Sequence, residues 1–158
     1  MKKILFISFL MALSAFAKAK PSLPKLEGYW LCTTSIAFEE YNLLEIYRLN
    51  LKSNFKVDQK GAIHFTNAEE EALLNYESSS DWSLNRNILS FKNLKANKYS
   101  INNEMFQKKY KVLDIFSDSP YEDTYSYEIQ KLTDDELVLY ANNDEFEWLS
   151  LTVNCFRT

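Results

Sequence analysis

The chain has 158 residues, a formal net charge of −4, 46% hydrophobic residues and 15% aromatic residues, which fits one globular domain and excludes a disordered, collagenous or disulfide-dense chain. With only two glycines, Gly28 and Gly61, the chain cannot form the glycine-rich loops that cradle phosphates. Its single histidine and two cysteines exclude ordinary zinc sites and argue against Ser-His-Asp or Cys-His catalysis.

Residues 1–19 have the three-part layout of a secretory signal peptide. Two lysines precede an apolar run from Ile4 to Ala17, and small residues follow, so we expect cleavage after Ala17 or Ala19. The run is shorter than the roughly 20 residues of a transmembrane helix, and no lipid-accepting cysteine lies at either cleavage position. The sequence therefore predicts an exported, soluble protein, periplasmic or secreted, with one domain over 20–158 and no membrane anchor.

Export and charge narrow the expected partners. Removal of the leader lysines makes the remaining domain more acidic, which disfavours nucleic acid and anionic lipid but permits a basic protein partner. Disulfides persist in oxidising compartments, so we expect Cys32 to pair with Cys155; two free buried thiols are the alternative. We expect a monomer.

Strand-like segments dominate the first half of the mature chain. From Gly28 to Phe38 the apolar residues alternate with polar ones, which predicts a half-buried strand, and a second strand over 43–51 is expected to pair with it. Short apolar runs over 55–57 and 63–65 flank Asp58-Gln59-Lys60-Gly61. This pattern predicts a hairpin in which Gly61 takes a positive φ.

The later segments continue the pattern. Residues 67–76 fit either a short helix or an irregular start to a strand, and Asn85-Arg86-Asn87 predicts a tight hairpin between strands at 81–84 and 88–91. Asparagine is frequent at such breaks and tolerates positive φ, so we expect it to replace glycine in the turns. The remaining strands are expected at 110–116, 125–132, 136–141 and 145–156. About 8–10 antiparallel strands in all predict an all-β barrel or sandwich.

The ends of the domain predict how the sheet closes. If the first and last strands pair antiparallel with Cys32 opposite Cys155, then Trp30 falls opposite Arg157. A guanidinium over an indole ring is favourable, at about 0.5–2 kcal/mol. First and last strands pair in this way when a sheet closes on itself, so the register predicts an up-and-down barrel.

Gly28-Tyr29-Trp30, with Arg157 on the last strand, resembles the Gly-x-Trp and terminal arginine of lipocalins and the wider calycin superfamily. The segments around 81–91 and 129–139 also look like bacterial lipocalin-like domains. The resemblance implies a barrel that holds a small, largely apolar ligand, with Trp30 and Arg157 in a structural role.

Two non-catalytic functions follow as the leading hypotheses, and an enzyme that uses carboxylates alone is a third. The first is a lipocalin-like protein that binds a small apolar ligand in the barrel. The second is a periplasmic inhibitor or immunity protein that binds a basic partner through an acidic, tyrosine-rich surface. The aromatic residues that could serve either function are Trp82, Tyr110, Tyr121, Tyr125 and Tyr127. No cofactor or metal is expected, since the consecutive acids at 69–71 do not converge on one point and the acids at 134–136 lack the pattern of a calcium loop.

Overall fold

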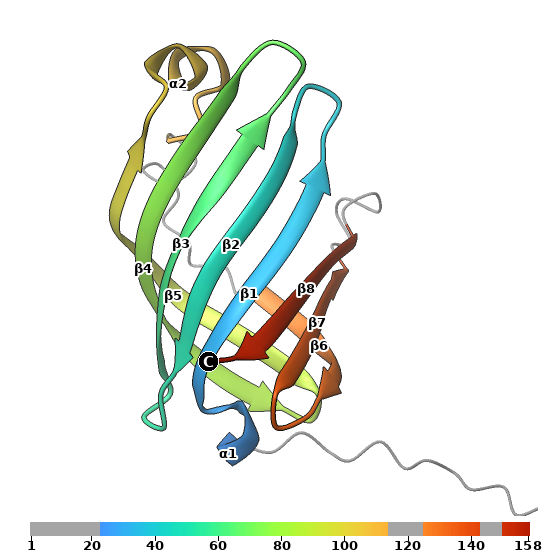
Figure 1. Cartoon of the computed structure of the whole chain (residues 1–158). Coiled ribbons are helices and arrows are strands. Elements are labelled where there is room, and N and C mark those ends of the chain that lie inside the picture. The colour runs from blue at the N-terminus through green and yellow to red at the C-terminus, as the bar shows by residue number, and fades with distance from the viewer. Residues whose placement is uncertain (1–22, 114–124, 143–149) are drawn as a thin grey trace, which may run out of the picture.

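A computed structural model describes residues 23–113, 125–142 and 150–158 (Figure 1). The described elements are α1 (Leu23–Leu26), β1 (Gly28–Ala37), β2 (Asn42–Leu51), β3 (Lys56–Thr66), β4 (Glu71–Asn85), β5 (Ile88–Ile101), α2 (Glu104–Tyr110), β6 (Tyr125–Leu132), β7 (Glu136–Asn142) and β8 (Ser150–Arg157).

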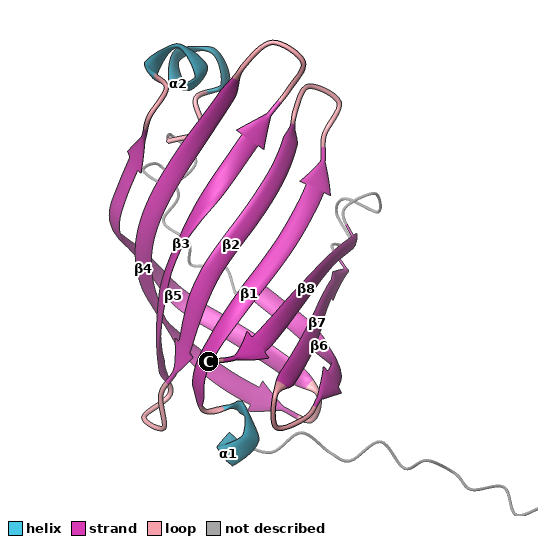
Figure 2. Cartoon of the chain, in the orientation of Figure 1, coloured by secondary structure: helices cyan, strands magenta, loops and turns pink. Residues whose placement is uncertain are grey.

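The strands form a closed antiparallel barrel in the order β1 to β8, and β8 pairs back onto β1. Each strand lies beside its neighbours in sequence, so the barrel is up-and-down, and the two helices lie at opposite ends of it (Figures 1 and 2). The predicted fold class is therefore confirmed, with eight strands. This architecture is compatible with a lipocalin-like fold.

Alternation of side chains separates the interior from the surface. On β1, Trp30, Cys32 and Thr34 are buried, whereas Leu31 and Ser35 are exposed. Successive side chains of a strand point to opposite faces, so the even positions of β1 fill the barrel and the odd positions meet solvent. The other strands contribute to the same interior, which makes one continuous hydrophobic core.

The seam between β1 and β8 has the register that the sequence predicts. Trp30 lies opposite Arg157 and Cys32 opposite Cys155, and the cysteines form a disulfide with Cα atoms 4.0 Å apart. That distance is slightly below the common range of about 4.4–6.8 Å, as befits directly opposed residues on paired strands. The disulfide thus joins the ends of the sheet covalently.

Arg157 closes the barrel end beside α1. Its guanidinium carbon is 4.2 Å from the centre of the Trp30 ring, and its Nη1 donates to the carbonyl of Glu27 at 2.8 Å. Gly28 has φ +119°, and a Cβ there would be 2.8 Å from Nη1 of Arg157. A side chain at position 28 would therefore strain the backbone and collide with the arginine, which explains the glycine two residues before the tryptophan.

The predicted hairpin at residues 58–61 is wrong, because β3 runs through these residues without a break. Gly61 is a strand residue without a positive φ. A Cβ at this position would be 2.4 Å from Cβ of Tyr47 and 2.6 Å from the carbonyl oxygen of Ile46. Glycine in a strand interior often marks such a close approach of a neighbouring strand. Gly61 lets β2 pass close to β3.

The strand predicted from residue 110 to 116 is also wrong over its described part. Tyr110 ends α2, which Asn103 begins by accepting a hydrogen bond from the backbone N–H of Phe106 at 3.0 Å. Residues 114–116 lie outside the described ranges. The open question at 67–76 is resolved by a turn at 67–70 followed directly by β4.

The hairpin at residues 85–87 is confirmed, but asparagine does not replace glycine as we expected. Among the described residues, the non-glycine positions with positive φ are Phe55, Arg86, Asn93 and Lys111, of which one is asparagine. Asparagines act instead through their side chains. In the turn before β4, the amide oxygen of Asn67 accepts from the backbone N–H groups of Glu69 and Glu70, at 2.9 and 2.8 Å.

Candidate ligand-binding cavity

The barrel encloses a cavity of about 280 Å³. Its wall combines apolar side chains with phenols, hydroxyls and carboxyls. The apolar part includes Leu49, Ile63, Phe91, Leu139, Leu151 and Val153, and the polar part includes Glu45, Tyr47, Gln59, Tyr76, Ser78, Ser80 and Tyr127. A mostly apolar hollow with a few convergent polar groups is the usual form of a small-molecule site.

Small side chains on β4 leave this space open. Ser78 and Ser80 both point inward and are buried, in a strand whose other inward residues include Tyr76 and Trp82. Beside them, the pairing of β4 with β5 shifts register twice, once next to Ser78 and again between Ser79 and Asp81. Such bulges bend a strand locally. Where the sheet borders the cavity, it therefore carries small side chains and is bent.

β5 and β6 diverge beside the cavity. The two strands pair only from Ile88 to Phe91 on β5, although β5 continues to Ile101. Leu94 and Ala96, from the unpaired continuation of β5, line the cavity together with Tyr125 of β6. On this side, the described residues that line the cavity come from strand segments that do not pair with each other.

A chain of hydrogen bonds crosses the cavity wall from β3 to β2. Gln59 donates through Nε2 to the Tyr76 hydroxyl at 2.7 Å, and that hydroxyl donates to Oε1 of Glu45. Burial raises the pKa of the Glu45 carboxyl, and the bond from Tyr76 opposes this shift only in part. Removal from water penalises the charged form of an acid, so Glu45 is costly to ionise in the empty barrel.

The phenols of the cavity are held neutral. Burial, with the neighbouring Glu45 carboxyl as a further cause, raises the pKa of Tyr127 to about 12 and raises the pKa of Tyr76 further. The pKa of Tyr47 is raised well above its usual value by burial first and by Tyr127 and Glu45 next. At neutral pH these groups can therefore donate or accept hydrogen bonds without carrying charge.

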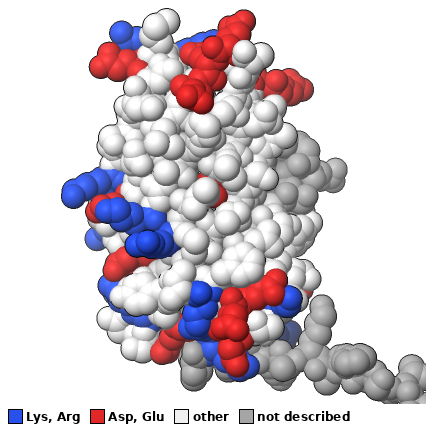
Figure 3. All heavy atoms as spheres, in the orientation of Figure 1, with Lys and Arg blue, Asp and Glu red and all other residues white. Residues whose placement is uncertain are grey.

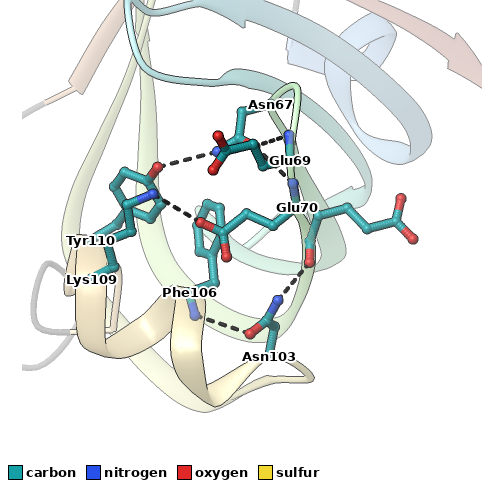
Figure 4. Close-up of polar contacts among 8 residues, drawn as sticks. Asn67, Glu69, Glu70, Asn103, Phe106, Lys109 and Tyr110 are labelled. Carbon is teal, nitrogen blue, oxygen red and sulfur yellow. Dashed lines mark hydrogen bonds and ion pairs between the residues drawn. The ribbon is translucent and has the colours of Figure 1, made fainter.

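Helix α2 closes one end of the barrel (Figures 1 and 4). Phe106, which is completely buried, stacks at 4.4 Å between ring centres on Tyr110 and at 5.5 Å on Phe65 of β3. Polar contacts hold the helix to the turn before β4. Asn67 donates to the Tyr110 hydroxyl at 3.1 Å, and Lys109 pairs with Glu70 at 3.1 Å.

The opposite end is filled by indole rings. The Trp30 ring donates through Nε1 to the carbonyl of Leu26 at 2.8 Å, and the Trp82 ring donates to the carbonyl of Lys52 at 2.9 Å. Phe55 packs against Trp82 from outside, with ring centres 5.5 Å apart. With both ends filled by aromatic side chains, the cavity lies in the middle of the barrel.

The structure brings together only part of the predicted set of aromatic residues. Tyr125 and Tyr127 line the cavity, whereas Trp82 and Tyr110 lie at opposite ends of the barrel. Tyr121 lies outside the described residues. The hydrogen bonds that link Gln59, Tyr76 and Glu45 were not predicted from the sequence.

The inward position of Glu45 could have been predicted from the sequence. Glu45 has the same parity as Leu43, Tyr47, Leu49 and Leu51, so it is the one acid on the apolar face of its predicted strand. A charged residue on the inward face of a strand is unusual unless it is paired or functional. Tyr76 and Gln59 gave no such signal, because Tyr76 ends a segment that fits either a short helix or the irregular start of a strand, and Gln59 lies in a predicted turn.

Most charged side chains on the face drawn in Figure 3 lie away from its middle, where a small acidic patch is visible. In Figure 3 they gather toward the two ends and along one side, where Lys and Arg are interspersed with Asp and Glu. Leu31 of β1 and Leu44 and Ile46 of β2 are exposed. None of the described helices is long and apolar enough to cross a membrane.

Comparison with models of known protein families gives no match, and a search of curated proteins finds no matching sequence either. The barrel and its cavity therefore carry the functional argument.

Proposed function

We propose that this chain is an exported, lipocalin-like binding protein that holds a small, largely apolar ligand in the barrel and does not transform it. The observation that carries the proposal is the cavity of about 280 Å³ in the middle of the barrel. A cavity of about 150 Å³ already binds benzene, so this one accommodates a ligand with a single ring and a short side chain.

The closed ends and the disulfide support the same proposal. The aromatic fillings at both ends and the Cys32–Cys155 bond hold the wall in place without a ligand. A preformed site loses less conformational freedom on binding than one that must order first. The disulfide and the signal-peptide pattern at 1–19 agree with an oxidising, extracytoplasmic location.

Binding of 2-phenylethanol, a probe that matches the cavity in size, tests the proposal. We expect ligand-observed NMR to detect binding to the mature protein and to lose it in Ser78→Phe, since the new ring occupies the cavity. Ser83→Phe places the same ring on the exposed face of β4 and should bind normally. Ser80→Leu is a second filling variant if Ser78→Phe does not fold, as judged by circular dichroism.

Absence of probe binding to the folded wild-type protein would overturn this function. Mass spectrometry of the native protein from its own host distinguishes the alternative. A retained small molecule supports the ligand-binding function, whereas a stoichiometric basic protein in place of a small molecule would favour the inhibitor or immunity function.

A further inference from the structure

We infer that the cavity selects organic cations, namely small amines with an apolar body, and that Glu45 is the residue that binds the ammonium group. This inference rests on the proposed ligand-binding function and specifies its ligand class. Glu45 projects from β2 into the cavity with one carboxylate oxygen held by Tyr76. Throughout the described ranges, its second oxygen has no protein donor.

Glu45 also has no cationic partner in the described part of the chain. The other carboxyl at the cavity, Glu77, provides the contrast, because Lys60 at 2.7 Å and Lys98 at 4.0 Å neutralise it from outside the barrel. A buried carboxylate is stable only when a positive charge or several hydrogen-bond donors meet it. In the empty cavity, a ligand can therefore supply the positive charge that Glu45 lacks.

The rest of the wall favours a positive rather than a negative ligand. Every ionisable side chain that lines the cavity is a carboxyl or a phenol, and none of the described lining residues is Lys, Arg or His. The rings of Tyr47, Tyr76 and Tyr127 surround the space near Glu45. Aromatic faces attract cations, and a charge is attracted more strongly away from bulk water.

The groups facing Glu45 also fix how binding depends on pH. Gln59 and Tyr76 face it from β3 and β4, Tyr47 from its own strand and Tyr127 from β6, and the phenols among them stay neutral through neutral pH. The hydrogen bond from Lys60 lowers the pKa of Glu77, the other carboxyl that lines the cavity, whereas burial raises the pKa of Glu45. Glu45 is therefore the first of the two carboxyls to take up a proton on acidification. Because an ammonium binds the ionised carboxylate, affinity for an amine should fall as the pH is lowered, while affinity for a neutral analogue should not change.

The test compares 2-phenylethylamine with 2-phenylethanol, which differ in charge but hardly in size, by titration calorimetry. At pH 7.5 we expect the amine to bind at least about tenfold more tightly, as for a hydrogen bond to a charged group. Glu45→Gln, which keeps an acceptor for Tyr76, should reduce the ratio to about one by weakening only the amine. Glu71→Gln removes an exposed carboxylate from β4 and should leave the ratio unchanged.

The outcomes separate this inference from the function on which it rests. If the alcohol binds as tightly as the amine, or if Glu45→Gln keeps the preference, then ligand binding stands and the amine inference is overturned. If neither compound binds, both proposals fail. The ratio of the two affinities in the wild-type protein can also be measured at pH 4, without a variant. If the amine still binds more tightly than the alcohol at pH 4, a role for ionised Glu45 is contradicted.

Discussion

Among the described residues, Glu45 has a position that packing alone does not explain. It is an acid on the inward face of an otherwise apolar strand, and its only described partner is the hydroxyl of Tyr76. A residue placed for packing alone at this position would be apolar, as Leu43 and Leu49 are on the same face. Natural proteins keep such unfavourable residues where function requires them, at a cost in stability.

That cost gives a prediction about Glu45→Gln. The folded barrel raises the pKa of this carboxyl, so the folded state holds the proton more tightly than the unfolded chain does. The stability contributed by Glu45 is therefore greatest at acid pH and is lost as the pH rises through its usual range and then through the raised value. Without ligand, Glu45→Gln should stabilise the barrel at pH 7 by about 0.5–2 kcal/mol, the usual gain when a residue that is unfavourable for stability is replaced.

Urea unfolding at pH 7 and pH 4 measures this effect. The advantage of Glu45→Gln over the wild-type protein should disappear at pH 4, where both side chains are neutral. Glu71→Gln, on the exposed face of β4, corrects for the general effect of removing a negative charge. A variant that is less stable than the wild-type protein at pH 7 would show that the carboxylate is satisfied in the barrel.

At the scale of elements, the sequence predicted strands better than it predicted their breaks. The alternation in β1 was clear because its inward residues are apolar, and β6 has the predicted bounds from Tyr125 to Leu132. The alternation was misleading in β3, where the polar stretch before Gly61 suggested a turn. In a closed barrel whose cavity has some polar groups in its wall, inward residues such as Gln59 need not be apolar, so the alternation weakens at the site itself.

The second half of β5 and helix α2 were missed for a related reason. Beyond Phe91, β5 leaves its partner β6, and most of its side chains are exposed, so no face of this segment is regularly apolar. Helix α2 is only seven residues long, and it buries a single ring, that of Phe106. Neither segment has enough buried surface to produce a periodic pattern in the sequence.

Helix α2 also gives a prediction at this scale. The Asn103 side chain caps the helix through the N–H of Phe106 and donates to the carbonyl of Glu71 on β4 at 2.9 Å. Asn103→Ala should destabilise the protein by about 1 kcal/mol, the usual value of an N-cap, and should speed hydrogen exchange in residues 104–110 more than elsewhere.

Asn103→Asp separates the two contacts, because aspartate keeps the cap and loses the donor to Glu71. We expect its stability to lie between those of the wild-type protein and Asn103→Ala. If Asn103→Ala leaves exchange in α2 unchanged, the helix is held by the Phe106 ring and not by its cap.

For the whole molecule, the sequence predicted closure of the barrel but not its cavity. Closure could be predicted because it depends on one register, in which a match between Cys32 and Cys155 places Trp30 against Arg157. The cavity could not be predicted in the same way. It is a space left between several strands, and its existence depends on small residues such as Ser78 and on the bends of β5, which a linear pattern does not reveal.

The disulfide should dominate stability at this scale. It links residues 123 positions apart, and the entropy removed from an unfolded chain by a loop of this length corresponds to about 5 kcal/mol. We expect the double variant Cys32→Ala, Cys155→Ala to unfold at lower urea concentration by about that free energy. Reduction of the wild-type protein serves as an independent comparison, and a loss below about 1 kcal/mol for either would show that strand pairing alone holds the seam.

The contact between Trp30 and Arg157 has a consequence for the order in which the barrel can be made. Its two residues lie near opposite ends of the described chain, and the strand that closes the barrel, β8, is synthesised after the seven other described strands. Contacts between residues so distant in sequence form late and slow folding. The hairpins from β1 to β5 can pair while the chain is still emerging, but the wall stays open until residues 150–157 arrive. Any chaperone that guards the nascent protein against aggregation must therefore act until β8 has been synthesised.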